Sequence, residues 1–405
     1  MDNAGIAWES QRATEFYANG ELVAALDVLQ QGVERRPDDY LLWAALSAVL
    51  ITFDRAAEAL EAVQRALTLV PDGPGALWAR VIRGMALLKL GRWEGWSDVM
   101  RRWELSPWTG WPQNPPWDGQ GQPEHLWLIA HPNDGLGDCL QELRFIPFLQ
   151  ERVGTVHVWA HQDLHPLIRT SFSDVHLTGA PDPDRVSVAT AAGPPVGTTP
   201  WLPLCGLAPR LCASMTSVPT QPYLRPDPAL IAWAREWLAT LPRPRLGLCW
   251  HCKLTAALPN LRTMDRHALH TLLTRFQTFT WLHLHPESLA PEELAALPGL
   301  RLVPPCPDPL APPLAQFAAI ISQLDYVVTV DTAILHLAGA LGCPTLVLLS
   351  RYSDWRWLEG ADRTPWYATV RVVRSPIEPG ARSLQQAWMS VIDLTSAVLQ
   401  NLAAR

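Results

Sequence analysis

The spacing of hydrophobic and polar residues divides the chain into an N-terminal helical part and a longer part in which strands and helices alternate. Up to about residue 105, apolar positions recur every three to four residues, as in amphipathic helices. From about residue 124, short apolar runs alternate with longer helical patterns, which is typical of βαβ units and parallel sheets. Residues 106–123, between the two parts, are rich in Pro, Gly and Trp, and we expect a linker there.

The helical part contains an internal repeat. Ala25-Leu26 and Pro37-Asp38 recur as Ala59-Leu60 and Pro71-Asp72, a period of about 34 residues. This period is that of tetratricopeptide repeats, whose paired helices stack into a short solenoid. A third unit is out of register and is interpreted as a degenerate cap. We predict tetratricopeptide-like repeats over residues 1–105, which either present a groove to a peptide or partner, or serve as a packing or dimerisation platform.

The alternating part is long enough for two α/β domains, which we place at residues 124–221 and 222–405. In the second of these, the apolar runs predict successive elements in the order strand, helix, strand. Strands are expected at 245–250, 280–285, 301–303, 326–330 and 345–349, and helices at 229–241, 265–275, 314–323 and 332–341. We therefore expect two Rossmann-like domains joined by a short bridge, with the active site in the cleft between them.

The stretch YVVTVDTAILHLAGALGCPTLVLL, residues 326–349, predicts one βαβ unit ended by Gly342 and Pro344. Asp331 is expected to be the N-cap of its helix, directly followed by Thr332. A strand-to-helix turn of this kind offers unpaired backbone N–H groups and the positive end of a helix dipole, which suit a diphosphate. His336 lies one turn later and points back toward the same end.

A second candidate turn follows the strand expected at 126–130. It contains Gly135-Leu-Gly137-Asp138, in which Asp138 is expected to be the N-cap of a helix over 139–151 that Pro147 kinks or ends. The two glycines leave bare backbone beside a carboxylate, at the sheet edge where α/β domains bind ligands. The alternative interpretation of Asp138 is a plain helix cap.

Composition and charge narrow the function. A net charge of −7 without a basic block argues against nucleic acid as a partner. The sequence has no signal peptide pattern and no apolar stretch that could span a bilayer, so we expect a cytoplasmic protein. Its seven cysteines are then expected to be reduced, and the lone Cys249-x-x-Cys252 pair does not predict zinc or redox chemistry. Asp182-Pro-Asp184 matches a metal-binding D-x-D pattern but lies in a proline-containing loop, and we predict no metal or other cofactor.

Several motifs together resemble glycosyltransferase family 9, the ADP-heptose heptosyltransferase-like proteins, particularly those with N-terminal tetratricopeptide repeats. The motifs are HPNDGLGDCLQELRFIP, VDTAILHLAGALGCP, SRYSDWRWL and TPWY, and the resemblance covers about residue 126 to the C-terminus. It implies the GT-B architecture, in which a first Rossmann-like domain binds the acceptor and a second binds the nucleotide-sugar donor. The fold class expected is therefore α/β, GT-B, preceded by all-α repeats.

The resemblance also implies roles for individual residues. Asp138 corresponds to the catalytic base, while Asp331, Thr332 and His336 correspond to the turn that binds the nucleotide diphosphate. A basic residue after the first strand of the second domain contacts phosphate in the family, and either Lys253 or Arg262 fills that place.

Other residues are candidates from their chemistry alone. Gly135 and Gly137 clear space for an acceptor, and Asp134 is the alternative base in the same turn. Trp355 and Arg356 are expected at the rim of the cleft, where an aromatic face and a cation suit stacking on a base or sugar. The alternative for this tryptophan is packing between domains.

The function expected is inverting, metal-independent transfer of a heptose-like sugar from a nucleotide diphosphate sugar, ADP-linked favoured, to a hydroxyl of a protein or glycan. The partners are then the nucleotide sugar and a protein or peptide acceptor bound through the repeats, and a homo-oligomer is compatible with this. Two alternatives remain open: a UDP-, GDP- or dTDP-sugar as donor, or a non-catalytic repeat scaffold with a degenerate GT-B body. The unusual loop at 251–262 and the short repeat array favour the scaffold, and the Asp138 and Asp331 turns favour the enzyme.

Overall fold

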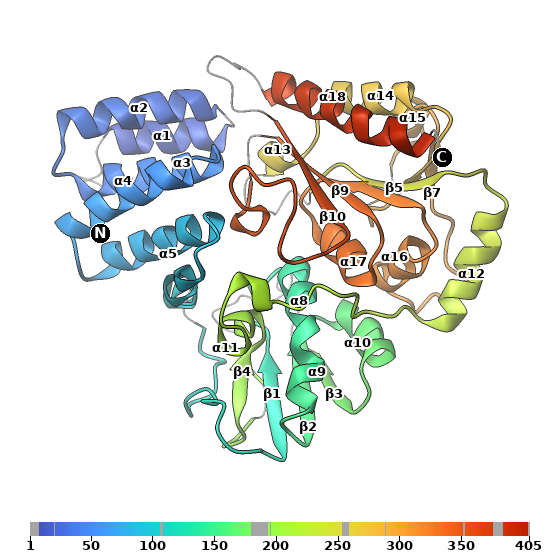
Figure 1. Cartoon of the computed structure of the whole chain (residues 1–405), viewed down its shortest axis with the longest axis horizontal. Coiled ribbons are helices and arrows are strands. Elements are labelled where there is room, and N and C mark those ends of the chain that lie inside the picture. Colours follow the sequence, from blue (N-terminus) through green and yellow to red (C-terminus); the bar gives the residue numbers. More distant parts are fainter. Residues whose placement is uncertain are drawn as a thin grey trace.

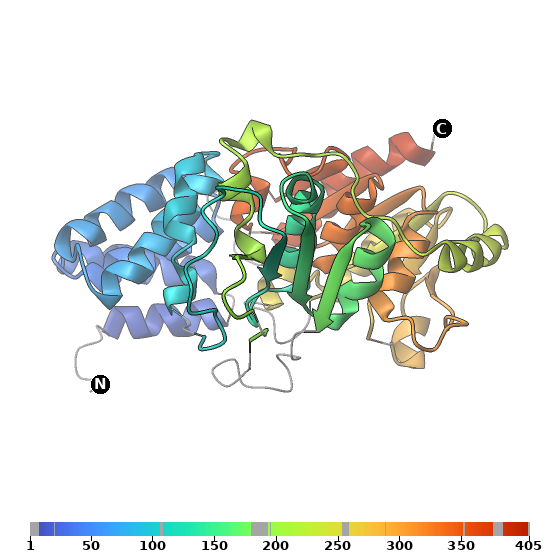
Figure 2. The same ribbon diagram turned by 90° about the horizontal axis from the view of Figure 1, so that it is seen from below.

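The computed structural model describes residues 8–19, 21–105, 108–179, 193–194, 196–252, 259–287, 289–350, 353–375 and 384–403. These residues form a helical repeat domain, a four-stranded α/β domain and a six-stranded α/β domain, in chain order (Figure 1). The predicted fold class is confirmed, because both sheets are parallel and the helical repeats precede them. The helical repeats lie at one end of the elongated molecule and α12 lies at the other (Figure 2).

The repeat domain consists of paired antiparallel helices followed by a shortened third unit. Its helices are α1 (Trp8–Ala18), α2 (Leu22–Arg35), α3 (Tyr40–Thr52), α4 (Ala56–Leu69) and α5 (Pro74–Lys89). The buried positions Ala25 and Ala59 lie 34 residues apart on α2 and α4, as the sequence period predicts. The partner of α5 is broken into η2 (Trp93–Gly95) and α6 (Trp96–Val99), and α7 (Arg102–Leu105) follows. Gly84 on α5 lies so close to the η2 turn that an added Cβ would lie 2.6 Å from the Gly95 carbonyl oxygen.

The first α/β domain is a parallel sheet in the order β3-β2-β1-β4. The strands are β1 (His125–Ile129), β2 (Thr155–Ala160), β3 (Val175–Gly179) and β4 (Trp201–Pro203), and the helices are α8 (Leu136–Glu142), α9 (Ile146–Gln150), α10 (His165–Ser171) and α11 (Ala208–Leu211). Residues alternate between its faces, so Leu126, Leu128 and Val158 pack under the helices while Trp159 and Trp201 point to the other face.

Tryptophans of the linker cover that other face. Trp108 stacks on Trp159 with ring centroids 5.2 Å apart, and Trp111 stacks on Trp201 at the same distance. Trp117 adds a backbone hydrogen bond to the carbonyl of Trp201. The Pro/Gly/Trp-rich segment thus takes the place of a helical layer against the first sheet.

The second α/β domain has a parallel sheet in the order β10-β9-β8-β5-β6-β7. Its strands are β5 (Arg245–Cys249), β6 (Thr280–His283), β7 (Leu300–Leu302), β8 (Tyr326–Thr329), β9 (Thr345–Leu349) and β10 (Val370–Arg374). In Figure 1, helices α12 (Pro228–Ala239), α16 (Pro313–Ile321) and α17 (Ala333–Leu341) lie on one face, and α14 (Arg266–Arg275) and α18 (Leu384–Ala403) on the other. Short helices α13 (Pro259–Arg262) and α15 (Pro291–Ala295) lie in connections. The strands and helices expected in this domain all form, with ends displaced by at most two residues.

Two expected helix caps are wrong. Helix α8 begins at Leu136 with Gly135 as N-cap, so Asp138 is its third residue and its side chain accepts a hydrogen bond from the Gly135 N–H at 3.1 Å. Helix α17 likewise begins one residue late, with Thr332 rather than Asp331 at the N-cap. Asp138 therefore caps α8 from the third helical position, and Asp331 lies one residue before the N-cap of α17. Gly342 ends α17 in the left-handed conformation at φ 76°, as expected.

The helix predicted over 139–151 is not continuous. It divides into α8, the 3-10 turn η3 (Leu143–Phe145) and α9, with Pro147 in the first turn of α9. Proline lacks an N–H and cannot occupy a helix interior without breaking a hydrogen bond, so it starts a new helix instead.

A buried ionic cluster joins the repeat domain to the second α/β domain. The Lys89 ammonium at the end of α5 is fully buried, lies 2.7 Å from the Asp54 carboxylate, and donates to the carbonyl of Ser353. Arg374 of β10 pairs with the same Asp54. The Glu359 carboxylate accepts from the Ala56 N–H at 2.8 Å, at the start of α4. The repeats are therefore fixed to the body of the molecule.

All seven cysteines are free thiols and six of them are buried, as expected. Among the described residues, no helix combines the length and the apolar character needed to cross a membrane.

Candidate functional site

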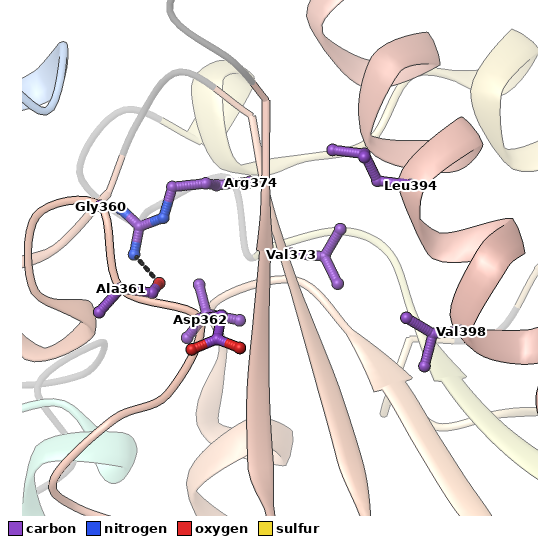
Figure 3. A pocket seen from close by; sticks show the side chains of 8 residues that line it. Gly360, Ala361, Asp362, Val373, Arg374, Leu394 and Val398 are labelled. Carbon is purple, nitrogen blue, oxygen red and sulfur yellow. Dashed lines mark hydrogen bonds between the residues drawn. The ribbon is translucent and has the colours of Figure 1, made fainter.

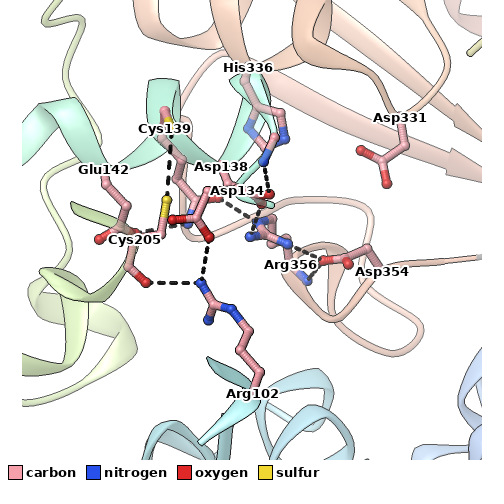
Figure 4. Close-up of polar contacts among 12 residues, drawn as sticks. Arg102, Asp134, Asp138, Cys139, Glu142, Cys205, Asp331, His336, Asp354 and Arg356 are labelled. Atoms are coloured by element: carbon pink, nitrogen blue, oxygen red, sulfur yellow. Dashed lines mark hydrogen bonds and ion pairs between the residues drawn. The ribbon is translucent and has the colours of Figure 1, made fainter. Parts of the chain in front are cut away.

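The two α/β domains meet where α8 packs against α17. Gly137 makes this contact possible, because an added Cβ would lie 2.7 Å from Cδ2 of His336. Glycine is thus required here by the close approach of the two helices, not by its backbone conformation. The predicted acceptor turn and the predicted donor helix therefore lie side by side, as Figure 4 shows for Asp138 and His336.

The Asp138 carboxylate lies near cationic side chains that come from other domains. Its Oδ1 accepts a hydrogen bond from Nη2 of Arg356 at 2.6 Å, and 36% of its side chain is exposed. Burial opposes ionisation, but the charges of Arg356 and Arg102 and the hydrogen bond from the Gly135 N–H outweigh it, so the pKa of Asp138 lies below its usual value. The carboxylate is accordingly ionised, accessible and paired.

Arg356 makes three side-chain hydrogen bonds to other side chains, two of which cross to the first α/β domain. Besides Asp138, its Nε donates to the Gln141 side chain of α8 at 2.9 Å, and its Nη1 donates to Asp354 of its own domain at 2.9 Å. The side chain lies with its guanidinium over the ring of Trp355, 4.3 Å from the centroid. Only 15% of the side chain is exposed, and the neighbouring carboxylates raise its pKa further above the ordinary arginine value despite burial. A fixed, permanently charged group therefore stands at the centre of the site.

Asp134, the alternative base, is occupied by structural contacts. Its Oδ2 accepts from the His131 N–H at 2.9 Å, which closes the turn after β1, and its Oδ1 lies 3.4 Å from Nη2 of Arg102. Only 5% of this side chain is exposed. Asp138 is therefore the carboxylate of this turn that a substrate can reach.

His336 is buried with a defined partner. Its Nδ1 lies 2.9 Å from the Tyr367 hydroxyl, and its ring packs 5.7 Å from that of Trp357. Burial, with nearby Arg356, lowers the pKa of His336 to about 3 although Asp138 opposes the shift. The imidazole is therefore neutral at physiological pH and contributes packing and polarity, not charge, to the contact with Gly137.

The turn after β8 holds a second buried carboxylate. Asp331 has 8% of its side chain exposed, and its Oδ2 lies 3.5 Å from Nη2 of Arg262, which also donates to the Asp331 carbonyl oxygen. Burial raises the pKa of Asp331, while Arg262 counteracts the rise. The Thr332 hydroxyl lies 3.3 Å from that of Thr329 and makes no cap hydrogen bond to α17. The first N–H groups of α17 consequently receive no side-chain cap from this residue.

Of the sequence candidates, Trp355 lies in a different environment from the one expected, and Lys253 lies outside the described residues. Trp355 is buried and packs edge-to-face on Trp96 of α6 at 5.1 Å and on Trp366 at 5.7 Å, so its ring serves the contact between domains and does not line an open rim. Lys253, like Asp182 and Asp184, lies outside the described residues. Of the two basic candidates for phosphate, Arg262 is the one whose contact with the Asp331 turn can be described.

Sequence reasoning missed the residues that hold the site in place. They are Arg102, Gln141, Glu142, Arg144, Asp354 and Tyr367. Glu142 accepts from the N–H groups of Leu207 and Ala208, and buried Arg144 donates to the Trp366 carbonyl across the domain boundary. Charged residues inside an apolar helical pattern, such as Glu142 and Arg144, were the available signal, because such groups are buried only when paired.

A separate depression lies between the loop at 360–362, β10 and α18 (Figure 3). Leu394 and Val398 line one side, and Arg374 donates to the Ala361 carbonyl at 2.9 Å on the other. Arg374 is already paired with Asp54, so this depression offers less for polar recognition than the site at Asp138.

Comparison with known proteins bears on the second α/β domain. Residues 272–387, which include α17, Asp331, His336 and Arg356, match the model of glycosyltransferase family 9 (heptosyltransferase). This segment of the chain is a glycosyltransferase family 9 domain. The resemblance noted in the sequence is thus confirmed for this domain, and helical repeats precede it.

Comparisons over most of the chain found further similar proteins. Protein FlbA of Caulobacter vibrioides is 26% identical over 400 residues, which cover 86% of this chain and 66% of FlbA. This chain therefore spans just under two thirds of the length of that relative. Among solved structures, a family 9 glycosyltransferase of Veillonella parvula is similar over 71% of this chain and 100% of its own, with 10% identity and a TM-score of 0.49. ADP-heptose heptosyltransferase II of E. coli is similar over 68% of this chain and 99% of its own, with 14% identity and a TM-score of 0.40.

Proposed function

We propose that this protein is an inverting glycosyltransferase that moves a heptose-like sugar from a nucleotide diphosphate sugar to a hydroxyl group, with Asp138 as general base. The observation that supports the proposal most strongly is the 2.6 Å pair between Asp138 of the first domain and Arg356 of the family 9 domain. Inverting transfer needs a carboxylate for the acceptor and cations for the leaving diphosphate, and these two requirements are met by adjacent residues.

In the proposed reaction, the acceptor oxygen forms a bond with the anomeric carbon as the bond from that carbon to the diphosphate oxygen breaks. The hydroxyl proton passes to Asp138, and the electron pair of the broken bond leaves with the diphosphate. Arg356, Arg262 and the N–H groups at the start of α17 would stabilise the negative charge on that leaving group. No step requires a metal ion, and we propose a metal-independent transfer.

The ion pair also suggests how the base is activated. As it stands, Arg356 lowers the pKa of Asp138, which makes the carboxylate a weak base. A diphosphate competes with Asp138 for the guanidinium, and its binding would raise the pKa of Asp138 by removing the effect of that cation. The acceptor would then be deprotonated only after the donor has bound.

We favour an ADP-linked sugar as donor, and UDP-, GDP- and dTDP-sugars are the alternatives. The first experiment is a thermal-shift series with the four nucleoside diphosphates on the full chain. A ligand of the native state raises the melting temperature by mass action, and ADP is expected to give the largest rise. No shift with any of the four would contradict a nucleotide-sugar site and favour the scaffold alternative.

The second experiment tests the base with donor and acceptor present. Asp138→Asn keeps the shape and removes the basicity, and is expected to lower turnover by about a hundredfold to ten-thousandfold with unchanged nucleotide affinity. Asp134→Asn is the matched control in the same turn. It is expected to lower the melting temperature, because Asp134 has structural partners, and to leave the turnover number of the folded enzyme nearly unchanged. A fully active Asp138→Asn would exclude this residue as base.

For the acceptor, we propose a protein or peptide that docks on the repeats. A groove between α2, α3 and α4 is lined by Gln30, Trp43, Leu46, Glu58, Glu61 and Arg65. Glu61→Arg combined with Arg65→Glu reverses two of its charges and is expected to abolish transfer to a macromolecular acceptor while ADP binding is retained. Unchanged transfer would leave the repeats as a packing or assembly platform. Substitutions are preferable to deleting 1–105, because deletion would expose the buried contacts of Trp355 and Ser353.

A further inference from the structure

Three histidines gather at the carboxyl edge of the second sheet, outside the site described above. His251 follows β5, His283 ends β6 and His285 lies two residues beyond. Since β5 and β6 are adjacent parallel strands, their ends deliver these side chains to one place. The ring centroids of His251 and His285 are 3.7 Å apart, and that of His283 lies 5.9 Å and 6.1 Å from them.

Each histidine can bring one ring nitrogen within 4.8 Å of the other two. In a tetrahedral zinc site the metal–nitrogen distance is about 2.0–2.1 Å, which separates the nitrogens by about 3.3 Å. The upper limit of 4.8 Å on the nitrogen separations is thus compatible with a site of this size.

Unsatisfied nitrogen atoms point to a ligand here. Nε2 of His283 and Nδ1 of His251 are buried, and neither has a hydrogen-bond partner among the residues that the structure describes. His283 is only 3% exposed, so water does not compensate for the missing partner at its surface. A buried polar atom without a partner costs about 1–3 kcal/mol, and two in one cluster require an explanation.

An acidic side chain completes the group. Oε2 of Glu287 lies 3.9 Å from Nε2 of His251 and 4.0 Å from Nδ1 of His285. The Glu287 N–H donates to Nδ1 of His285 at 3.2 Å, which orients that ring through its backbone neighbour. Three imidazoles with a carboxylate nearby are a ligand set for a borderline divalent transition metal, while Mg²⁺ and Ca²⁺ prefer oxygen.

We propose that His251, His283 and His285, with Glu287 as a fourth or outer ligand, bind one Zn²⁺-type divalent ion. Burial lowers the pKa of His283 to about 4 and also that of His251, so both rings are neutral at physiological pH, as metal ligation requires. The ion would tie the segment after β5 to the end of β6.

The site adjoins the donor turn through one residue. Cys252, the neighbour of His251, lies with its Sγ 3.6 Å from the Asp331 carbonyl oxygen. A metal that fixes His251 would therefore also restrain the segment that contacts the Asp331 turn. The proposal is nevertheless independent of the transfer reaction, since it concerns the binding of the ion itself.

The test uses the full chain without a polyhistidine tag, stripped with EDTA and then incubated with Zn²⁺. After gel filtration, elemental analysis is expected to find about one Zn²⁺ per chain, and Co²⁺ in place of Zn²⁺ is expected to give the intense visible absorption of a tetrahedral site. The variants His251→Asn and His285→Asn are each expected to lower the amount of retained zinc at least tenfold. The His251 ring is partly exposed in the wild-type chain.

A second histidine cluster supplies the matched control. His125, His157 and His176 lie side by side on β1, β2 and β3 of the first sheet, and the first two are hydrogen bonded at 3.2 Å. His157→Asn is expected to leave the retained zinc unchanged. The proposal is overturned if the wild-type chain retains no zinc, or if His157→Asn removes it while His251→Asn and His285→Asn do not. Circular dichroism of each variant in EDTA establishes that it is folded before zinc is scored.

Discussion

At the scale of single residues, the site consists of charges that neutralise one another across a domain boundary. Arg356 is the shared partner, with Asp138 and Gln141 on one side and Asp354 on the other. Charge-assisted hydrogen bonds of this kind are stronger than neutral ones and fix the geometry of a planar guanidinium. The arrangement holds the reactive carboxylate in a defined place before substrate binds.

The buried His336 predicts a loss of stability in mild acid. Its folded pKa of about 3 lies below the ordinary 6.5, so between these values only the unfolded chain takes up the proton. The stability is fully present above pH 6.5 and decreases as the pH falls, by about 2 kcal/mol from this residue between pH 7 and pH 5. Urea unfolding at both pH values measures it.

His336→Asn is expected to remove that share of the pH dependence, since asparagine does not titrate. The groups facing His336 are Asp138, Arg356, Arg144, Arg262 and Tyr367, and all are retained in this variant. His270→Asn, at an exposed position on α14, is the control. An equal pH dependence in wild type and His336→Asn would contradict the prediction.

Gly137 provides the second prediction at this scale. In Gly137→Ala the new methyl would lie 2.7 Å from His336, and either α8 or α17 must shift. We expect a loss of about 1–3 kcal/mol in unfolding free energy, as for overpacked core positions, together with reduced turnover. Gly135→Ala is matched, because its Cβ would meet only Asp138 Oδ2, at 3.2 Å. Equal stability of the two variants would argue against the close helix contact.

At the level of helices and strands, α5 and β10 are joined by a carboxylate between the buried ammonium of Lys89 and the partly buried guanidinium of Arg374. Asp54 pairs with both Lys89 and Arg374, and 8% of its side chain is exposed. Burial lowers the pKa of Lys89 while Asp54 opposes the shift, so the lysine depends on this partner for its charge. Asp54 is consequently a central member of the polar contact between the repeats and the second α/β domain.

Asp54→Asn is expected to lower the unfolding free energy by about 3–5 kcal/mol, because it leaves buried cations without their partner. Asparagine is chosen because it tolerates the left-handed conformation of Asp54, φ 56°. The control is Asp38→Asn, which breaks the exposed pair with Arg65 and should cost about 0–1 kcal/mol. Chemical denaturation of both variants measures the loss in unfolding free energy. A similar loss in the two variants would mean that the cluster is solvated.

At the scale of the whole molecule, one hydrophobic core extends through all three domains. Trp96 of the repeats, Leu140 of the first α/β domain and Trp366 of the second belong to it. The domains are therefore packed as one body and not merely tethered by linkers.

Calorimetry is expected to give a single unfolding transition in which the calorimetric and van't Hoff enthalpies agree. Limited proteolysis should correspondingly release no stable repeat fragment. Two separated transitions, or a protected fragment ending near residue 105, would show that the repeats fold independently. If the chain unfolds in a single transition, the nucleoside diphosphate that binds should raise the midpoint temperature of that transition. Binding to one domain stabilises the others when all of them unfold together.

Elements with a strong local signal could be predicted from the amino-acid sequence. The period of 34 residues defined the repeats, and buried strands followed by apolar helical patterns defined the second sheet, because periodicity and turn residues are local properties. The motifs around Asp331 and Asp138 also led to the family 9 resemblance, which the family model confirms for residues 272–387. The weak strand β4, only three residues long, gave no such signal.

The partners of these residues could not be predicted in the same way, because they come from distant parts of the chain. Asp138 and Arg356 are separated by 218 residues, and the spacing of either says nothing about the other. The same is true of His336 and Gly137, of Lys89 and Ser353, and of the three histidines that adjacent strands bring together. Helix starts also moved by a residue or more, because Gly135 and Thr332 occupy the caps that the carboxylates were expected to fill. Local sequence fixes the backbone pattern, but burial and charge pairing depend on contacts between distant segments.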